Sequence, residues 1–263
     1  MSGSGEALVG KVVLVSGGTQ GLGAAVARVA AREGASVAVI GRRKEVGEAF
    51  AAELAAKTAR EVFFTPADVG DVARATLAVR RTVERFGRVD CLVNVAGFTD
   101  RGSLVDTTPE LFDRHIAVNL KAPFFLMQAA VTDMRRRQEP GSIVNVISMS
   151  AHGGQPYLAA YVAAKAGLAG LTRNAAHAHR WDRIRINGLN IGWTRTPGED
   201  AIQRRFHDAE DDWADRAGST LPMGRLGDPD EIADAVVFLL SERSGVVTGS
   251  VIDWDQQVRG AYD

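Results

Sequence analysis

A serine, a tyrosine and a lysine within the stretch Ser142–Gly170 have side chains suited to proton transfer. Ser148 precedes Tyr161 by thirteen residues, and Lys165 follows Tyr161 by four. The i,i+4 spacing places the phenol of Tyr161 and the ammonium of Lys165 on one face of a helix. A hydroxyl, a phenol and an ammonium that meet in this way can hold a substrate oxygen and exchange a proton with it. The stretch therefore predicts a proton-handling site.

Three predicted elements position these side chains. Residues 142–148 are apolar and rich in β-branched side chains, which is typical of a buried strand that ends at Ser148. Ser150–Pro156 contains glycine and proline and predicts a loop. The residues that follow Tyr161 are small and compatible with a helix. A strand end and a helix face would therefore meet across this loop.

A glycine-rich turn near the N-terminus predicts a phosphate site. The predicted strand Lys11–Ser16 leads into this turn, and an alanine-rich helix then extends to about Glu33. Such a turn brings backbone N–H groups and a helix N-terminus to a phosphate, and its glycines allow close approach. The G-x-x-x-G-x-G spacing departs from the common G-x-G-x-x-G fingerprint, and a purely structural turn is the alternative. The turn consists of Gly17, Gly18, Thr19, Gln20, Gly21, Leu22 and Gly23.

Two arginines follow the second predicted strand, Ser36–Ile40. In dinucleotide-binding folds an acidic residue here accepts from ribose hydroxyls, whereas an arginine accommodates a 2′-phosphate. The turn holds Arg42 and Arg43 and no acidic residue, and guanidinium groups suit phosphate. We therefore expect NADP(H) in preference to NAD(H). Exposed arginines that merely cap a turn are the alternative.

Strands and helices alternate along the whole chain. We expect further strands at 61–66, 90–95, 183–190 and 251–254, and helices that begin after the caps Asp71, Thr108 and Asp228. The Thr108 helix would carry Asn119 in its middle. This pattern predicts one doubly wound, Rossmann-type α/β domain over residues 1–263, with a seven-stranded, mostly parallel sheet and helices on both faces. Residues 1–8 would form a flexible tail, and residues 198–221 one or two short helices over the substrate.

The residues noted so far share one edge of the predicted sheet. In an open parallel sheet the ligand lies beyond the carboxyl ends of the strands. The positions at those ends are Gly17, Arg42, Asp68, Asn94, Ser148 and Gly192.

Composition argues against several other functions. The formal net charge is −1, so nothing favours nucleic acid or an anionic membrane surface. The single cysteine, Cys91, lies in an apolar run and is expected to pack as a buried residue. No cluster of histidine, cysteine and carboxylate side chains has the spacing of a metal site. We expect no metal, and a cytoplasmic location.

The motifs together resemble the short-chain dehydrogenase/reductase family, in its form with a glycine-rich segment and a Tyr-x-x-x-Lys pair. Any one of them arises by chance, but the ordered set is specific, and the resemblance covers almost all of the chain. It is carried by Gly17-x-x-x-Gly21-x-Gly23, Asp68, Asn94-Val95-Ala96-Gly97, Asn119, Ser148, Tyr161-x-x-x-Lys165 and Gly192–Thr196.

The resemblance implies a catalytic tetrad and a nicotinamide cofactor. Tyr161 would be the general acid or base, with its pKa lowered by the Lys165 cation and the oxidised nicotinamide. Ser148 would hold the substrate oxygen, Lys165 also the nicotinamide ribose, and Asn119 a water in the proton path. A homotetramer, or a homodimer, is also implied. With Tyr161 and Lys165, the cofactor residues would be Gly17, Thr19, Gln20, Gly21, Leu22, Gly23, Arg42, Arg43, Asp68, Val69, Asn94, Ala96, Gly97, Gly192, Thr194 and Thr196.

The chain departs from the family pattern in four places. Val95 replaces an asparagine, Ile191 a proline and Gln20 an often basic residue, so the phosphate argument depends on the two arginines. Asp255-Gln256-Gln257 replaces Asp-Gly-Gly, before a tail that ends at Tyr262-Asp263.

The substrate is expected to be a secondary alcohol or its ketone. The candidate contacts are Ser150, His152, Gln155 and Trp193, with Phe98, Thr99, Met149, Tyr157 and the segment 198–221. Their mixture of polar and aromatic groups suits a polyol, a sugar or a ring ketone, although His152 could simply brace a loop. The alternatives are an NAD-dependent alcohol dehydrogenase and a non-catalytic dinucleotide-binding protein.

Overall fold

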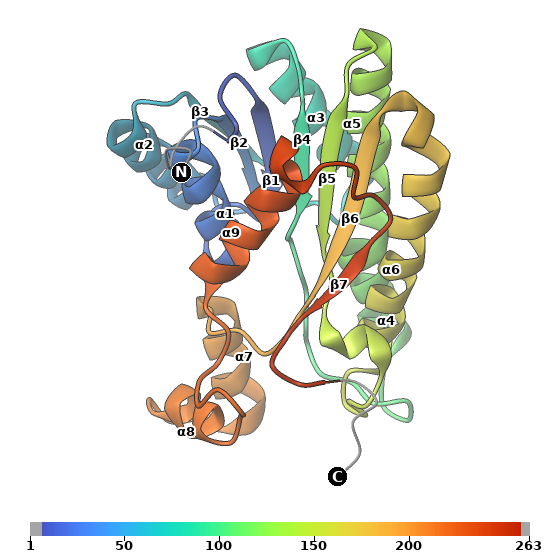
Figure 1. Ribbon diagram of the computed structural model, residues 1–263. Helices are drawn as coiled ribbons and strands as arrows, with labels where there is room; N and C mark the ends of the chain where they lie inside the picture. The colour runs from blue at the N-terminus through green and yellow to red at the C-terminus, as the bar shows by residue number, and fades with distance from the viewer. Residues whose placement is uncertain (1–6, 259–263) are drawn as a thin grey trace.

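The structure is a computed structural model that describes residues 7–258 (Figure 1). Within that range seven parallel strands form one sheet in the order β3-β2-β1-β4-β5-β6-β7. The predicted seven-stranded Rossmann-type sheet is thus confirmed. The strands are β1 (Val12–Ser16), β2 (Ser36–Gly41), β3 (Val62–Pro66), β4 (Cys91–Asn94), β5 (Gly141–Val146), β6 (Ile184–Ile191) and β7 (Val251–Trp254).

The strand order changes direction beside β1. This strand pairs with β2 through Val13↔Val37 and with β4 through Val13↔Cys91. The chain therefore winds outward in one direction from β1 to β3 and in the other from β4 to β7. A crevice opens at such a switch point, beyond the carboxyl ends of the strands, and ligands of open parallel sheets bind there.

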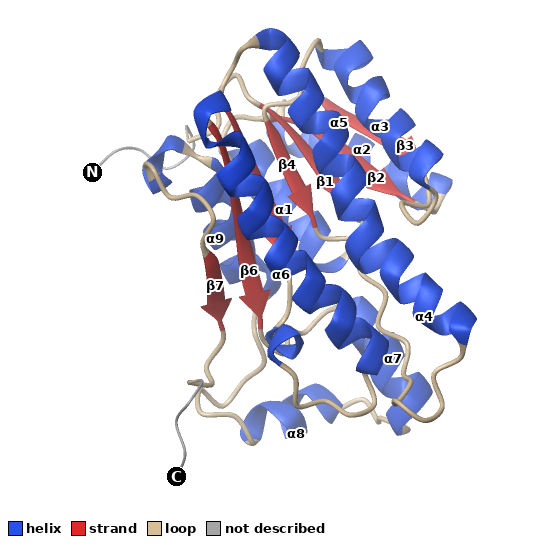
Figure 2. Ribbon diagram, turned by 90° about the vertical axis from the view of Figure 1, so that its right-hand side faces the viewer, coloured by secondary structure: helices blue, strands red, loops and turns tan. Residues whose placement is uncertain are grey.

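Helices cover both faces of the sheet (Figures 1 and 2). One face carries α1 (Gly21–Arg32), α2 (Lys44–Thr58) and α9 (Pro229–Leu240). The other face carries the remaining long helices, which are α3 (Val72–Phe86), α5 (Ala122–Arg137) and α6 (Ala159–His179).

The two faces are buried in alternation along β1. Val13 and Val15 belong to the apolar cluster beneath α1 and α9, whereas Leu14 belongs to the cluster on the opposite face. Successive strand residues point to opposite faces, so a strand covered on both sides must be apolar throughout. All five residues of β1 are buried.

The predicted caps hold their helices. The side chains of Asp71 and Thr108 accept hydrogen bonds from the backbone N–H groups of Arg74 and Leu111, each at 3.2 Å. Asp228 accepts from the N–H of Asp230 at 2.7 Å and so caps α9. These side chains satisfy backbone donors that the first helical turn leaves unpaired.

The expected helix around Asn119 is not uniform. It begins as α4 (Pro109–Ile116), widens into a π-helical turn over Ala117–Lys121 and continues as α5. Asn119 lies within the π turn. Such wide turns are rare in helices and are frequent at functional sites.

Both ends of the described chain differ from expectation. The proposed flexible tail over residues 1–8 reaches too far, because Leu8 is 1% exposed and the Ala7 N–H donates to the Glu33 carboxylate at 3.1 Å. Residues 1–6 and the C-terminal Tyr262-Asp263 lie outside the described residues. Near the C-terminal end of the described residues, the Gln256 side chain accepts a hydrogen bond from the Met223 N–H and donates one to the Arg225 carbonyl.

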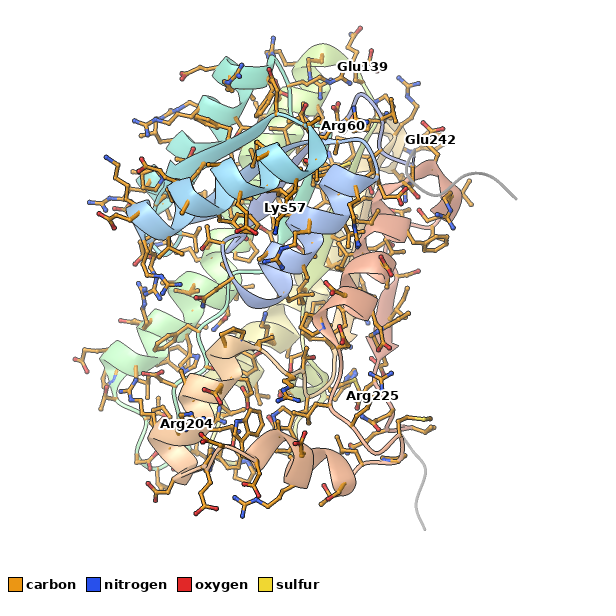
Figure 3. The ribbon with its side chains drawn as sticks, turned by 90° about the vertical axis from the view of Figure 1, so that its left-hand side faces the viewer. Lys57, Arg60, Glu139, Arg204, Arg225 and Glu242 are labelled. Carbon is orange, nitrogen blue, oxygen red and sulfur yellow. The ribbon has the colours of Figure 1, made fainter. Side chains whose placement is uncertain are left out.

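The segment 198–221 contains two short helices, as predicted. They are α7 (Pro197–His207) and α8 (Trp213–Ser219), which lie together at one end of the molecule (Figure 1). Figure 3 shows Arg204 of α7 at that end, far from Lys57 and Arg60. The two helices are joined by Trp213, whose indole Nε1 donates to Asp200 at 2.8 Å. We call residues 198–221 the lid.

Candidate active site

A cavity of about 670 Å³ lies at the carboxyl ends of the strands. The glycine-rich turn forms one wall, Tyr161 and Lys165 of α6 another, and Glu199 of the lid contributes to a third. Predicted cofactor residues that line this cavity are Gly17, Thr19, Gln20, Gly21, Leu22, Gly23, Arg42, Arg43, Asp68, Val69, Ala96, Gly97, Tyr161, Lys165 and Thr196.

The glycine-rich turn is shaped for a ligand that approaches its backbone. Gly17 has a φ of +69°, which L side chains rarely adopt. A Cβ on Gly23 would lie only 2.1 Å from the Gly17 carbonyl oxygen. The N-terminus of α1 opens here without a side-chain cap and without an acidic residue in its first turn. Its unpaired N–H groups and positive dipole end therefore fit an anion.

The close approach of backbone to Gly23 predicts that a larger residue at this position destabilises the protein. Gly23→Ala should lower the free energy of unfolding by about 1–3 kcal/mol, because the added methyl group meets backbone that must shift. Urea unfolding measures the change. Gly198→Ala is the matched control on α7, where the atom nearest to an added Cβ, the Thr196 Oγ1, lies at an ordinary contact distance of 3.9 Å. An unchanged Gly23→Ala protein would contradict the packing seen in the turn.

Arg42 and Arg43 stand beside the cavity at the end of β2. Both side chains are exposed, and no acidic residue occupies this turn. The Arg43 guanidinium donates to the side-chain oxygen of Gln20, which belongs to the glycine-rich turn. Gln20, the departure from the family pattern, thus fixes an arginine instead of supplying a charge.

Tyr161 and Lys165 line the cavity, whereas Ser148 is not among its lining residues. Tyr161 and Lys165 are 8% and 3% exposed, and the Lys165 Nζ lies 5.7 Å from the centroid of the Tyr161 ring. Lys165 donates to the Val146 carbonyl at 2.8 Å, which ties α6 to the end of β5. Ser148 follows this strand end, and its hydroxyl donates to the Ser150 hydroxyl at 3.1 Å.

Burial governs the pKa values of both titratable groups. It raises the pKa of Tyr161 to about 12, although the Ser148 hydroxyl acts in the opposite direction. It also lowers the pKa of Lys165 to about 8. Lys165, which was expected to lower the pKa of Tyr161, is not among the groups that shift it. Formation of a phenolate near neutral pH needs a further positive charge beside the phenol.

Asn119 is fully buried, and its side chain holds backbone rather than facing the cavity. Its Nδ2 donates to the Phe98 carbonyl at 2.8 Å, and its Oδ1 accepts from the Phe98 N–H at 3.0 Å. His115, one turn earlier, lies 3.3 Å from the Asn119 Nδ2 through its Nδ1 and 3.0 Å from the Asp100 carbonyl through its Nε2. These bonds fix the loop after β4, which carries Phe98 and Thr99 into the cavity wall.

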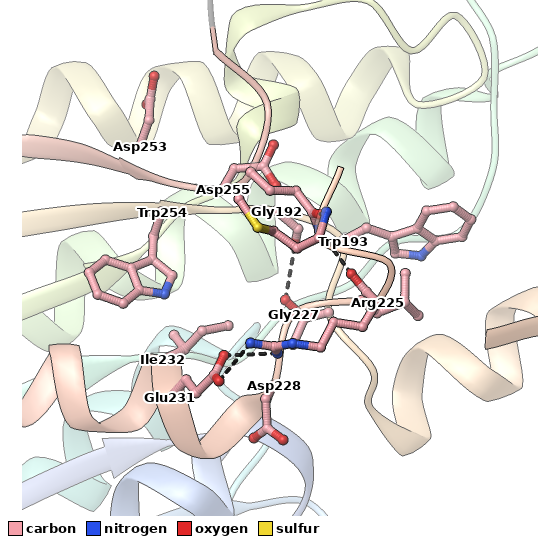
Figure 4. Close-up of a pocket in the computed structure, with 14 residues that line it drawn as sticks. Gly192, Trp193, Arg225, Gly227, Asp228, Glu231, Ile232, Asp253, Trp254 and Asp255 are labelled. Carbon is pink, nitrogen blue, oxygen red and sulfur yellow. Dashed lines mark hydrogen bonds and ion pairs between the residues drawn. The ribbon is translucent and has the colours of Figure 1, made fainter. Parts of the chain in front are cut away.

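Three predicted cofactor residues lie elsewhere. Asn94 points into the sheet, where its Nδ2 donates to the Asn145 side chain at 2.8 Å. Gly192 and Thr194 line a second cavity of about 350 Å³ near the start of α9, shown in Figure 4. These three residues do not line the large cavity, because residues at one strand end can face opposite sides of the loop that follows it.

Asp68, which is predicted to face the cofactor, already accepts two hydrogen bonds from the protein. Its carboxylate receives the Arg114 guanidinium at 2.9 Å and the Gly70 N–H at 2.9 Å. Burial raises the pKa of Asp68, but these donors together hold it below its usual value. Asp68 and Val69 still line the large cavity.

The predicted substrate residues are largely bonded to other side chains. His152 lies 2.9 Å from Asp253 of β7, so bracing of its loop is the better interpretation. Gln155 accepts from the Ser150 hydroxyl at 2.6 Å. Trp193 borders the second cavity (Figure 4) and donates its Nε1 to Glu199 at 2.9 Å.

The structure adds polar lid contacts that the sequence did not reveal. Arg205 of α7 donates to the Asp100 carboxylate at 3.1 Å, and Arg101 donates to His207 at 3.2 Å. Glu199 enters the wall of the large cavity. A sequence signal for Glu199 existed, since it stands three residues after Thr196 in the Ser/Thr-x-x-Glu pattern of a helix start.

Other expectations concern absences. Among residues 7–258 no group of three histidine, cysteine or carboxylate side chains could hold a metal ion. In the same range no helix is long and apolar enough to cross a membrane. Cys91 is buried as predicted, and burial raises the pKa of its thiol to about 12.

Comparisons with known proteins show which family the chain is similar to. A family model described as enoyl-(acyl carrier protein) reductase matches residues 17–256. An uncharacterised oxidoreductase of Thermotoga maritima is 39% identical over 247 residues, covering 94% of this chain and 96% of that protein. Trans-4-hydroxycyclohexanecarboxylate dehydrogenase of Sinomonas cyclohexanicum is 36% identical over 245 residues, covering 91% and 89%.

A solved structure extends the likeness to the fold. L-sorbose reductase from Gluconobacter frateurii, in complex with NADPH and L-sorbose, superposes with a TM-score of 0.91. It is 27% identical, and the match covers 98% of this chain and 100% of that one. On these matches, and on the motifs that the structure gathers around one cavity, the chain belongs to the short-chain dehydrogenase/reductase family, whose oxidoreductases bind a nicotinamide dinucleotide and act on alcohols and ketones.

Proposed function

We propose that this protein is an NADP(H)-dependent oxidoreductase that interconverts a secondary alcohol and its ketone, with Tyr161 as general acid and base. The observation that carries the proposal is the single cavity that joins Tyr161 and Lys165 to the glycine-rich turn. A buried phenol within reach of a dinucleotide-shaped groove is the arrangement that proton transfer beside a hydride donor requires.

The residues of the cavity fit a dinucleotide. The tight turn at Gly17 and Gly23 and the open N-terminus of α1 suit the pyrophosphate. Arg42 and Arg43 suit a 2′-phosphate, because guanidinium groups offer parallel N–H donors to phosphate oxygens. NADPH in the related L-sorbose reductase supports the choice. The cofactor supplies or accepts the hydride when it is bound.

The protein supplies position and the proton. Ser148 and Tyr161 hold the reacting oxygen between two hydroxyl groups, and Tyr161 donates its proton when a ketone is reduced. In the reverse direction Tyr161 takes the proton of the alcohol. Lys165 is fixed to the Val146 carbonyl and offers its charge beside the phenol. Asn119 holds Phe98 in the cavity wall through two hydrogen bonds.

The test of this function is turnover of a ketone panel, followed through the absorbance of the reduced nicotinamide. We expect oxidation of NADPH with at least one cyclic or hydroxylated ketone, and weaker activity with NADH. Binding of NADPH without hydride transfer to any ketone would instead favour a non-catalytic protein.

We also propose that the protein assembles as a homotetramer. Helix α6 presents the small residues Ala163, Ala166 and Gly170 to solvent on one stripe, and Phe124 of α5 is 44% exposed. Small side chains allow two helices to approach closely. Light scattering coupled to size exclusion measures the mass, and a monomer would contradict the proposal. The cytoplasmic location stays a prediction.

A further inference from the structure

Glu199 of the lid does not play the part that its sequence position suggests. It is the third residue of α7 after the cap Thr196, whose hydroxyl accepts from the Glu199 N–H at 3.1 Å. In such a pattern the glutamate side chain usually turns back to the N–H of the cap residue. Here the Glu199 carboxylate accepts from the Trp193 indole at 2.9 Å and the Gln203 amide at 2.7 Å.

These two donors fix the Glu199 carboxylate on the lid. Glu199 lines the same cavity as Tyr161 and Lys165. Its negative charge contributes to the raised pKa of Tyr161, after the larger effect of burial. Because Glu199 and Tyr161 line one cavity, a substrate whose oxygen is held by Tyr161 can also reach the Glu199 carboxylate.

The bonding of Glu199 leaves acceptor capacity in the cavity. Both donors bind the same oxygen, Oε1, and within residues 7–258 the second oxygen accepts no hydrogen bond. An ionised carboxylate has about four lone-pair positions. The fixed Oε1 and the spare Oε2 together form a preorganised acceptor.

The nearby Arg101 guanidinium only partly offsets the effect of the Glu199 charge on Tyr161. Arg101 also affects the pKa of Tyr161, in the opposite direction and less than Glu199 does. Its guanidinium is held by the Thr99 carbonyl at 3.0 Å and His207 at 3.2 Å, and it stacks on Tyr157. The site therefore favours a neutral substrate that can donate a hydrogen bond and disfavours a carboxylate near the reacting carbon.

We propose that Glu199 determines substrate specificity by accepting a hydrogen bond from a substrate hydroxyl close to the reacting carbon, so that the substrates are hydroxy ketones and the corresponding diols. This inference rests on the proposed function of the cavity. Discrimination of this kind is strong because a site built to bind a hydroxyl group leaves a charged acceptor unpaired with the deoxy analogue.

The first test compares 2-hydroxycyclohexanone with cyclohexanone, with NADPH in excess. The ratio of the two kcat/KM values should favour the hydroxy ketone in the wild type and fall about ten- to hundredfold in Glu199→Ala, the range for a hydrogen bond to a charged group. Glu210→Ala is the matched control, since this lid glutamate pairs with Arg216 at the surface. NADPH affinity, measured by fluorescence, should stay unchanged and shows that the variant is folded.

A second test uses the charge of Glu199. Because that charge raises the pKa of Tyr161, Glu199→Gln should shift the pH profile of kcat/KM for alcohol oxidation to lower pH, whereas Glu210→Gln should not. A discrimination ratio that survives Glu199→Ala would overturn the inference and leave the proposed function intact. A wild type that reduces neither ketone nor any other of the panel would overturn the proposed function itself.

Discussion

Replacing Tyr161 with phenylalanine should lower kcat for ketone reduction by about 10²- to 10⁴-fold, the usual contribution of a positioned general acid. The change removes one oxygen from a side chain that is 8% exposed, so packing in the cavity is kept. KM for the ketone and the affinity for NADPH should change little, because ring and backbone stay in place. Steady-state kinetics with a responsive ketone measures the effect.

Tyr157→Phe is the matched control for Tyr161→Phe. Tyr157 is 44% exposed and contacts Arg101 and His207 through its ring face rather than through its hydroxyl. We expect at most a few-fold change in kcat. Equal rates for wild type and Tyr161→Phe would show that another group supplies the proton, and the assignment of Tyr161 would have to be abandoned.

Arg42→Ala should weaken the binding of NADPH about ten- to hundredfold and leave the binding of NADH nearly unchanged. The reason is that only NADPH carries a 2′-phosphate, to which a guanidinium gives charge-assisted hydrogen bonds worth about 1.5–3 kcal/mol each. Arg42 is exposed beside the cavity, so its removal leaves no buried gap. Fluorescence titration with each cofactor measures both dissociation constants.

Two comparisons sharpen this result. Arg60→Ala removes an exposed charge far from the lid (Figure 3) and should affect neither cofactor. Arg43→Ala should give a smaller loss than Arg42→Ala, because Arg43 already donates to Gln20 and so has fewer free donors. An equal loss of NADPH and NADH affinity in Arg42→Ala would mean that Arg42 does not recognise the 2′-phosphate.

The sheet and its strand ends were predictable from local patterns. Apolar, β-branched runs such as Val12–Ser16 are compatible with burial on two faces, and caps such as Asp71 have a fixed local geometry. The spacing of Tyr161 and Lys165 also acts locally, within one helix. These features depend on residues that are neighbours in the chain, so the sequence contains the information directly.

The side-chain directions at the site were not predictable in the same way. Asn94 is the last residue of β4 and Thr194 follows β6, yet one bonds within the sheet and the other lines the second cavity. Glu199 matches the pattern of a helix cap but is captured by Trp193 and Gln203. Each outcome is decided by a competing partner from another part of the structure, which local propensity does not specify.

The pKa of Tyr161 was likewise not predictable from local sequence. The lysine four residues away was visible in the sequence and suggested a lowered value. Burial of the phenol, which raises the value to about 12, depends on how closely the elements around α6 pack. Desolvation is a property of the whole assembly of elements and has the larger effect here.

The position of β1 between β2 and β4 has a consequence for folding during synthesis on the ribosome. Val12 pairs with Asp90, which follows it by 78 residues. At about 5–20 residues per second, a ribosome needs roughly 4–16 s to make that stretch. During this interval the most apolar strand of the sheet has a neighbour on one edge only. Helix α1, which is made next, is the first helix available to cover β1 before β4 emerges and pairs with its other edge.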